Sequence, residues 1–511
     1  MIDWFRRNRT SARVAFGMRL FVMGANGLCS FFWTKLILRA MGDRLNGLFI
    51  AYQAVVTLGG LGDLGMGGAV GLRAGQALGR RDEAGLRSFL ANARSVFLIL
   101  SLGTFVVLFV LAPWLPTWLH FEPTPGAGSF TTLFMVGAVS AALVIFNSYW
   151  QNLNYAAGTV VWPILPGFVL AQLALCSHWI LAKSGSPLWV QITPYVGTAV
   201  IMFLLIKAMV NWAHPSLGNI LPLHFRWNEW RFLLSSSVWA YLCSLGNVIY
   251  TSTDQLVIKA GFASENLPRY RYNYRLCELA LQLVLTASLV SMPKITQWMA
   301  SALASERERA AREIHRLNQF QVVLGCAAAL VYLAINDIFV RIWLGERYVA
   351  PLGWGIAFAL NLAITTGGDS SIQVAGRCGA NGIRVAGIAI GSTGVFNLIL
   401  SITSMKLGSI TGIAVSTVIA QSILSLILGA YICNQLKLAR LQWFSKSWGI
   451  PVLIIGIGAL LKYFLPPSSI PSFALLAVCY VCLLFAVAWL AGVKLEMIRS
   501  EIATFRSLAR R

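Results

Sequence analysis

Charged residues are scarce in this 511-residue chain. Only 11% of its residues are Asp, Glu, Lys or Arg, whereas a soluble domain averages about 25%, so an ordinary soluble enzyme is excluded. Acidic residues are the scarcer kind, with 18 against 40 Lys and Arg, and the net charge is +22. The 57% of hydrophobic residues also excludes a disordered chain. This composition indicates a polytopic membrane protein.

Residues that commonly hold metals or cofactors are few and scattered. The five histidines lie far apart, and the nine cysteines fall mostly inside apolar stretches. Even the one close pair, Cys479 and Cys482, lies in the middle of an apolar run. This placement favours small buried side chains over redox or metal ligands. The sequence therefore predicts no metal site, no catalytic residue and no cofactor.

Apolar runs of about 20 residues, the length of a helix that crosses a bilayer, recur along the whole chain. Because backbone groups in lipid must be hydrogen-bonded internally, these runs are predicted to be helices. The first run follows a basic segment and is too long for a signal peptide, so we expect it to be retained. The fourteen predicted spans are 14–38, 47–72, 92–112, 129–150, 160–182, 187–210, 232–258, 274–298, 318–344, 351–374, 383–405, 410–434, 447–465 and 471–493.

Basic residues are distributed unevenly between the two sides of the membrane. An even number of spans places both termini on one side, and segments on that side carry more than twice as many Lys and Arg residues as the opposite side. The positive-inside rule therefore predicts that both termini are cytoplasmic. Topology and attraction to anionic membrane lipids explain the net charge without a nucleic-acid partner.

The two halves of the first twelve spans resemble each other. Leu-Ile-Leu-Arg-Ala at 36–40 matches Leu-Val-Ile-Lys-Ala at 256–260, and Trp-Leu at 118–119 matches Trp-Leu at 343–344. The offset covers six spans, so both copies cross the membrane in the same direction. The pattern predicts an N-lobe over 1–215 with spans 1–6 and a C-lobe over 216–440 with spans 7–12. Residues 441–511 then hold spans 13 and 14 and a basic cytoplasmic tail.

Several short motifs lie along the same twelve spans. They are GLGDLGMGGA at 60–69 with Arg73 and GRRDE at 79–83, TDQLVI at 253–258 with Tyr270 and Tyr274, FVRIWLG at 339–345, QVAGR at 373–377 and GSITGIAV at 408–415. Together they resemble the polysaccharide flippase (Wzx-like) family of the multidrug/oligosaccharidyl-lipid/polysaccharide (MOP) exporter superfamily. The resemblance implies an all-α, MATE-like fold with two six-helix lobes around a central cavity, plus two C-terminal helices.

Ionisable residues in or beside the spans are candidates for function, because a charge costs about 2.5–3.5 kcal/mol at the centre of a membrane helix. Arg19 either reaches back to the cytoplasmic headgroups or holds a pyrophosphate. Lys35 either anchors the helix at the interface or binds substrate. Arg275 either pairs with Glu278 at i,i+3 or presents positive charge to a substrate. The candidates for substrate binding are Arg19, Lys35, Lys259 and Arg275.

Acidic residues are the candidates for ion coupling or gating. Asp63 lies among glycines and either caps locally or takes part in gating. Asp369 lies in a polar interruption of the tenth span, where an unwound segment would bind ions. The candidates for ion coupling or gating are Asp63, Asp254, Glu278 and Asp369. The charged stretch at 305–316 is predicted to be a solvated cytoplasmic helix.

The resemblance implies a non-enzymatic transporter of the bacterial cytoplasmic (inner) membrane. It would flip a lipid-linked (undecaprenyl-diphosphate) oligosaccharide from the cytoplasmic to the outer leaflet by alternating access, for O-antigen, capsule or exopolysaccharide biosynthesis. A polysaccharide polymerase and chain-length machinery would be its partners. An ion-coupled multidrug exporter of the same superfamily is the alternative. A membrane glycan polymerase or ligase is disfavoured, because the longest outer loops, near 113–128 and 259–273, are too short for a folded domain.

Overall fold

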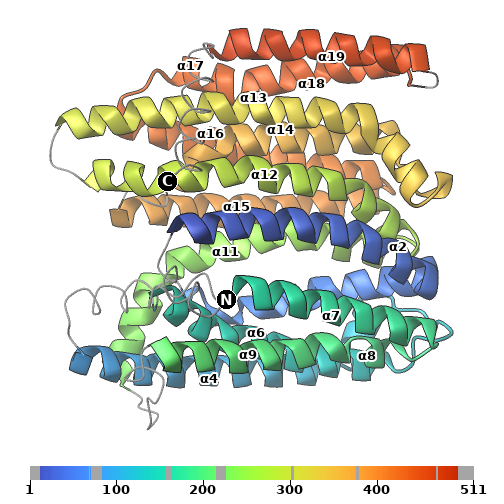
Figure 1. Ribbon diagram of the computed structural model, residues 1–511, viewed down its shortest axis with the longest axis vertical. Coiled ribbons are helices and arrows are strands. Elements are labelled where there is room, and N and C mark those ends of the chain that lie inside the picture. Colours follow the sequence, from blue (N-terminus) through green and yellow to red (C-terminus); the bar gives the residue numbers. More distant parts are fainter. Residues whose placement is uncertain are drawn as a thin grey trace. The chain divides into compact units, whose positions relative to one another are not determined.

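The computed structural model describes residues 12–67, 70, 83–156, 163–213, 226–300, 304–375, 379–467 and 470–492. Over these residues the chain is almost entirely helical and contains no strand. The long helices run in a similar direction within each half (Figure 1). The predicted all-α polytopic membrane fold is confirmed.

The helices coincide with the predicted spans. The first span and the second span as far as Gly59 lie on α2, which has a non-helical break at Gly42 with φ +74°. In the first half the helices are α2 (Ala12–Gly59), η1 (Gly60–Asp63), α4 (Glu83–Leu111), α5 (Leu115–Trp118), α6 (Phe130–Ala156), α7 (Ile164–Lys183), α8 (Leu188–Gln191) and α9 (Thr193–Ala213).

The second half contains the remaining helices. They are α11 (Trp227–Gly261), α12 (Asn266–Ala300), α13 (Ala304–Trp343), η2 (Glu346–Tyr348), α14 (Leu352–Ala375), α15 (Gly379–Lys406), α16 (Ile410–Leu436), α17 (Arg440–Phe444), η3 (Ser445–Gly449), α18 (Ile450–Phe464) and α19 (Ile470–Ala491). Within the described residues, ten segments are long and apolar enough to cross a membrane, one of which contains both parts of α2. The other three long helices, α11, α12 and α14, carry more polar residues.

One prediction about the connections between helices was wrong. The predicted outer loop at 259–273 is only four residues long, because α11 continues to Gly261 and α12 begins at Asn266. Its polar residues are held in the helix by contacts that hydropathy does not detect: Arg269 donates to the carbonyl oxygen of Val349, and Asn273 Nδ2 donates to that of Tyr348 at 2.7 Å. The charged stretch 305–316 is helical as predicted, and it forms the first turns of α13.

The chain divides into two compact units. One contains Met1–Val248 and Ile258–Pro268, and the other contains Ile249–Val257 and Arg269–Arg511. In the first unit α4 packs against α6, and α6 and α7 pack against α9; in the second unit α13 packs against α14, and α14 and α15 pack against α16. These are equivalent helices of the two predicted six-helix repeats. The lobe boundaries at 215 and 440 stay a prediction.

The last two helices belong to the second unit. Both α18 and α19 pack against α13, and Figure 1 shows the three side by side. Lys462 on α18 pairs with Asp337 on α13, with Nζ and Oδ2 2.6 Å apart and the lysine side chain only 6% exposed. At the other end Gln319 of α13 donates to the carbonyl oxygen of Ala491 at 2.6 Å. A buried ion pair and a hydrogen bond therefore fasten both ends of this helix pair.

Small residues allow the helices of the second unit to approach closely. A Cβ atom at Gly367 of α14 would collide with the carbonyl oxygen of Ser447, and one at Gly368 would lie 2.7 Å from the Oγ of Ser425. Glycine leaves room for backbones to meet where lipid supplies no hydrophobic driving force. The pair Gly367–Gly368 therefore brings α14 against η3 and α16.

A substitution in α14 tests this packing. We expect Gly367→Ala to destabilise the protein by about 1–3 kcal/mol, because its Cβ meets backbone that has little freedom to move. The matched control is Gly355→Ala in the same helix, where a Cβ meets nothing within 4 Å. Alanine should be neutral or favourable there, since it is about 1 kcal/mol better than glycine in a helix. Thermal unfolding of the two purified variants in detergent compares them, and equal melting temperatures would contradict the packing argument.

Candidate functional site

A buried carboxylate in the second unit is surrounded by hydroxyl groups. Asp254 lies near the end of α11 and is only 6% exposed. Its Oδ2 accepts hydrogen bonds from Thr417 Oγ1 at 2.9 Å and from the Tyr270 hydroxyl at 3.1 Å. Its Oδ1 accepts one from Ser401 Oγ at 3.2 Å. Four helices, α11, α12, α15 and α16, thus contribute to one polar centre.

The charge of Asp254 has no cationic partner in the part of the chain that the structure describes. An ionised carboxylate buried in apolar surroundings is costly unless it is paired or coordinates a cation. Asn397 lies one turn before Ser401 and adjoins the same carboxylate. Its side chain is fully buried, and neither its amide oxygen nor its nitrogen has a hydrogen-bond partner of good geometry among the described residues. The centre therefore has one negative charge and spare oxygen ligands.

The donor set around Asp254 suits a monovalent cation or a proton. Its atoms are carboxylate, hydroxyl and amide oxygens, which are ligands for hard cations. A single carboxylate balances one positive charge, whereas divalent ions are usually held by several carboxylates. Among the residues that the structure describes, no group of three or more His, Cys, Asp or Glu side chains comes together.

A second polar cluster lies on α12. The predicted i,i+3 pair is confirmed, with Arg275 Nη1 2.7 Å from Glu278 Oε2. Arg271 contacts the same carboxylate at 3.3 Å, so two guanidinium groups share one carboxylate and leave a charge of +1. The three side chains are 23–28% exposed. Arginine donors of this kind suit phosphate oxygens, and Glu278 restrains both of them.

The other basic candidates lie elsewhere. Lys259 is 3% exposed, and its Nζ donates to the carbonyl oxygen of His120 at 2.7 Å and lies 5.2 Å from the centre of the Phe121 ring. It therefore braces the loop after α5. Lys35 is half-buried on α2. Arg19 is also on α2, but its side chain lies outside the described residues.

Two acidic candidates take part in local contacts. Asp63 ends η1, where its Oδ1 accepts from the backbone N–H of Gly65 at 3.0 Å and its Oδ2 from Ser148 Oγ at 3.1 Å. Asp369 accepts from Gln321 Nε2 at 2.7 Å. The expectation of an unwound segment around Asp369 was wrong, because α14 is continuous from Leu352 to Ala375. The glycine pair of α14, Gly367–Gly368, allows close packing and does not interrupt the helix.

The solved structures that resemble this chain are transporters and flippases. The lipid II flippase MurJ, in an inward closed conformation, aligns with a TM-score of 0.67 and 14% identity over 93% of this chain and 97% of that chain. An inward-facing multidrug resistance transporter of the MATE family and MOP superfamily aligns with a TM-score of 0.57 and 13% identity over 85% and 98%. The MATE transporter DinF-BH in complex with R6G gives 0.56 and 16% over 86% and 98%.

These similarities establish the fold. No family model matches the chain, and no curated protein matches it by sequence. With helices in all fourteen predicted spans, the chain has the polytopic membrane fold that MurJ shares with the MATE transporters of the MOP superfamily.

The cation-binding capacity of Asp254 can be tested by substitution. We expect sodium ions or protons to raise the melting temperature of the wild-type protein, and Asp254→Asn to lose that dependence because it removes the only charge of the centre. A ligand at 100 times its dissociation constant stabilises by about 2.7 kcal/mol. Thermal unfolding in sodium chloride against choline chloride, at several pH values, measures the effect.

The matched control is Asp337→Asn, which removes a carboxylate of the same unit that pairs with Lys462. It should lower the melting temperature and keep the cation dependence. An unchanged cation response in Asp254→Asn would show that the Asp254 centre does not bind the cation.

Proposed function

We propose that this protein flips a lipid-linked oligosaccharide, with undecaprenyl diphosphate as the carrier, from the cytoplasmic to the outer leaflet by alternating access. The observation that carries the proposal is the cluster of Arg271, Arg275 and Glu278 on a membrane helix. Two partly exposed guanidinium groups offer charge-assisted hydrogen bonds to a diphosphate. A diphosphate and a sugar chain need such groups in place of their hydration shell to cross hydrocarbon.

The fold supports a lipid-linked cargo. MurJ aligns over 93% of this chain, whereas the MATE structures align over 84–86%. The chain has two helices, α18 and α19, beyond the twelve of its repeats. MurJ is named as the flippase of a lipid, lipid II. This likeness and the motifs of the Wzx-like family together favour a flippase.

In this proposal the Asp254 centre couples transport to a cation. Binding of sodium or a proton would neutralise the buried carboxylate and favour one state of the transport cycle. Such coupling requires only that the two states differ in their affinity for the cation. Asp254 and Arg275 would then serve separate steps, one for the ion and one for the cargo.

The location and partners follow from the same proposal. The positive-inside bias favours cytoplasmic termini in the bacterial inner membrane. The cargo would belong to O-antigen, capsule or exopolysaccharide biosynthesis, so a polysaccharide polymerase and chain-length machinery would act after the flippase. Lys35, Lys259, Asp63 and Asp369 remain candidates for substrate binding or gating in this scheme, as does Arg19.

A multidrug exporter is the second candidate. The similarity to MATE transporters and the buried, unpaired carboxylate of Asp254 favour it, because a carboxylate attracts cationic compounds. The positive cluster on α12 opposes it. Transport of a cationic dye and of a lipid-linked glycan by the same preparation separates the two functions.

Transport in proteoliposomes tests the proposal. We expect the wild-type protein to exchange a fluorescent undecaprenyl-diphosphate oligosaccharide between leaflets, so that a membrane-impermeant reductant bleaches the whole signal. Arg271→Gln/Arg275→Gln should slow exchange by about a hundredfold or more, since each of the two lost charge-assisted hydrogen bonds contributes about 1.5–3 kcal/mol. The corresponding Lys variants should retain part of the rate, because they keep the charge.

The control for this assay is Arg341→Gln on α13, which removes an arginine from an exposed ion pair with Glu346. Its exchange rate should equal that of the wild type. If several lipid-linked glycans stay in their leaflets while a cationic dye is moved, the exporter function replaces the flippase.

A further inference from the structure

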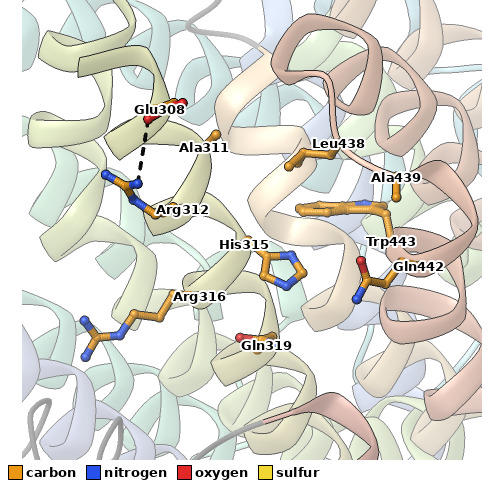
Figure 2. Close-up of a pocket in the computed structure, with 10 residues that line it drawn as sticks. All are labelled: Glu308, Ala311, Arg312, His315, Arg316, Gln319, Leu438, Ala439, Gln442 and Trp443. Carbon is orange, nitrogen blue, oxygen red and sulfur yellow. Dashed lines mark ion pairs between the residues drawn. The ribbon is translucent and has the colours of Figure 1, made fainter. Parts of the chain in front are cut away.

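A pocket opens near the start of α13 in the second unit. It has a volume of about 530 Å³ and lies between the first turns of α13 and the segment that joins α16 to α17. Figure 2 shows His315 pointing from α13 toward Trp443 and Gln442, whereas the side chains of Arg312 and Arg316 extend to the other side of the same helix. Neither of the clusters described above contributes to it.

The pocket is rich in positive charge. Arg312 and Arg316 line it, and the Lys446 ammonium lies close enough to interact with His315. Among the described lining residues the acidic one is Glu308, whose Oε2 is 3.8 Å from Arg312 Nη1, with both side chains more than 70% exposed. An ion pair this long and this exposed contributes little to the stability of the protein. Arg312 is therefore available to another anion.

The pocket also lies where the chain changes from polar to apolar. On α13 the residues before 317 are mostly charged and those after 320 are mostly apolar. The far wall is formed by Leu438 and by Trp443, which is 2% exposed, while Leu441 beside it is 85% exposed. An exposed leucine on a short helix at such a boundary is typical of the membrane interface. Headgroups lie at this level of a bilayer.

We propose that this pocket binds the headgroup of an anionic phospholipid. Arg312 and Arg316 donate to the phosphate, and the acyl chains stay in the bilayer beside Leu441. Basic pockets between membrane helices are suited to phosphate headgroups. The site is separate from the cargo cluster on α12, so it does not depend on which substrate the protein moves. It would fasten the start of α13 to the linker before α18.

Lipid binding to the full-length protein tests this site. Native mass spectrometry of delipidated protein in detergent, titrated with dioleoyl phosphatidylglycerol, gives the affinity. Each basic residue near a phosphate surface contributes about 1 kcal/mol, so Arg312→Gln should bind about fivefold more weakly and Arg312→Gln/Arg316→Gln about 25-fold. Arg312→Lys should stay within about twofold of the wild type. Dioleoyl phosphatidylcholine should show no difference between wild type and variants.

The matched control is Arg309→Gln, which removes an exposed arginine of the same helix outside the pocket. Its affinity should change less than twofold. Equal losses in Arg309→Gln and Arg312→Gln would mean diffuse attraction to the surface and would overturn the proposal. Displacement of the lipid by millimolar inorganic phosphate would also overturn it, because the site would then take a free anion. If the double variant fails to fold, the exposed Arg312 alone decides the outcome.

Discussion

Compensation of buried charge is the constraint on which the polar architecture of this protein depends. Inside an apolar helical bundle each ionised group needs a partner, and the structure meets this need in different ways. Lys462 and Asp337 neutralise each other, and two arginines surround Glu278. Among the described residues, the hydrogen-bond donors to Asp254 are neutral hydroxyl groups. The first arrangement is electrically complete, whereas the cluster on α12 carries excess positive charge and the Asp254 centre excess negative charge. The cluster on α12 and the Asp254 centre, in which charge is not balanced, are therefore the functional candidates.

Close approach of helices makes the other polar contacts possible. Gly367 and Gly368 let η3 and α16 reach α14, and Asn318 then donates to the carbonyl oxygen of Gly367 at 2.7 Å. Ser447 donates to Asn318 in turn at 3.1 Å. A side-chain network of this kind is stable only when every member is satisfied. It links the start of the last two helices to the centre of the second unit.

The sequence predicted the helices well because length and hydropathy decide them in a membrane. All fourteen spans were located, and the pair of Arg275 and Glu278 followed from helical spacing alone. Arg271 was overlooked as a partner, although it lies two helical turns before Glu278 and so shares its face. The early start of α12 was missed because contacts of Arg269 and Asn273 with distant backbone decide it.

The side chains that surround Asp254 could not be predicted from the sequence. Serine and threonine are frequent in membrane helices, and nothing in their local pattern selects Ser401 and Thr417 as neighbours of one carboxylate on another helix. Only the stripe of Thr393, Asn397 and Ser401, one turn apart on an apolar helix, could have indicated a polar face. Tertiary packing brings the donors together. The same limit applies to Lys259, whose partner is a carbonyl oxygen far away in the chain.

The hydroxyl groups around Asp254 determine how fast the hydrogen bonds of the centre can rearrange. A hydroxyl donates its hydrogen to an anion, or turns a lone pair toward a cation, by rotation about a single C–O bond. Side-chain rotations of this kind take picoseconds to nanoseconds when they are unhindered, far less than the microseconds to milliseconds of helix movements. The hydroxyl groups of the centre can therefore reorient while every helix axis stays in place. In any cycle built on this centre, their reorientation would be faster than the rearrangement of whole helices.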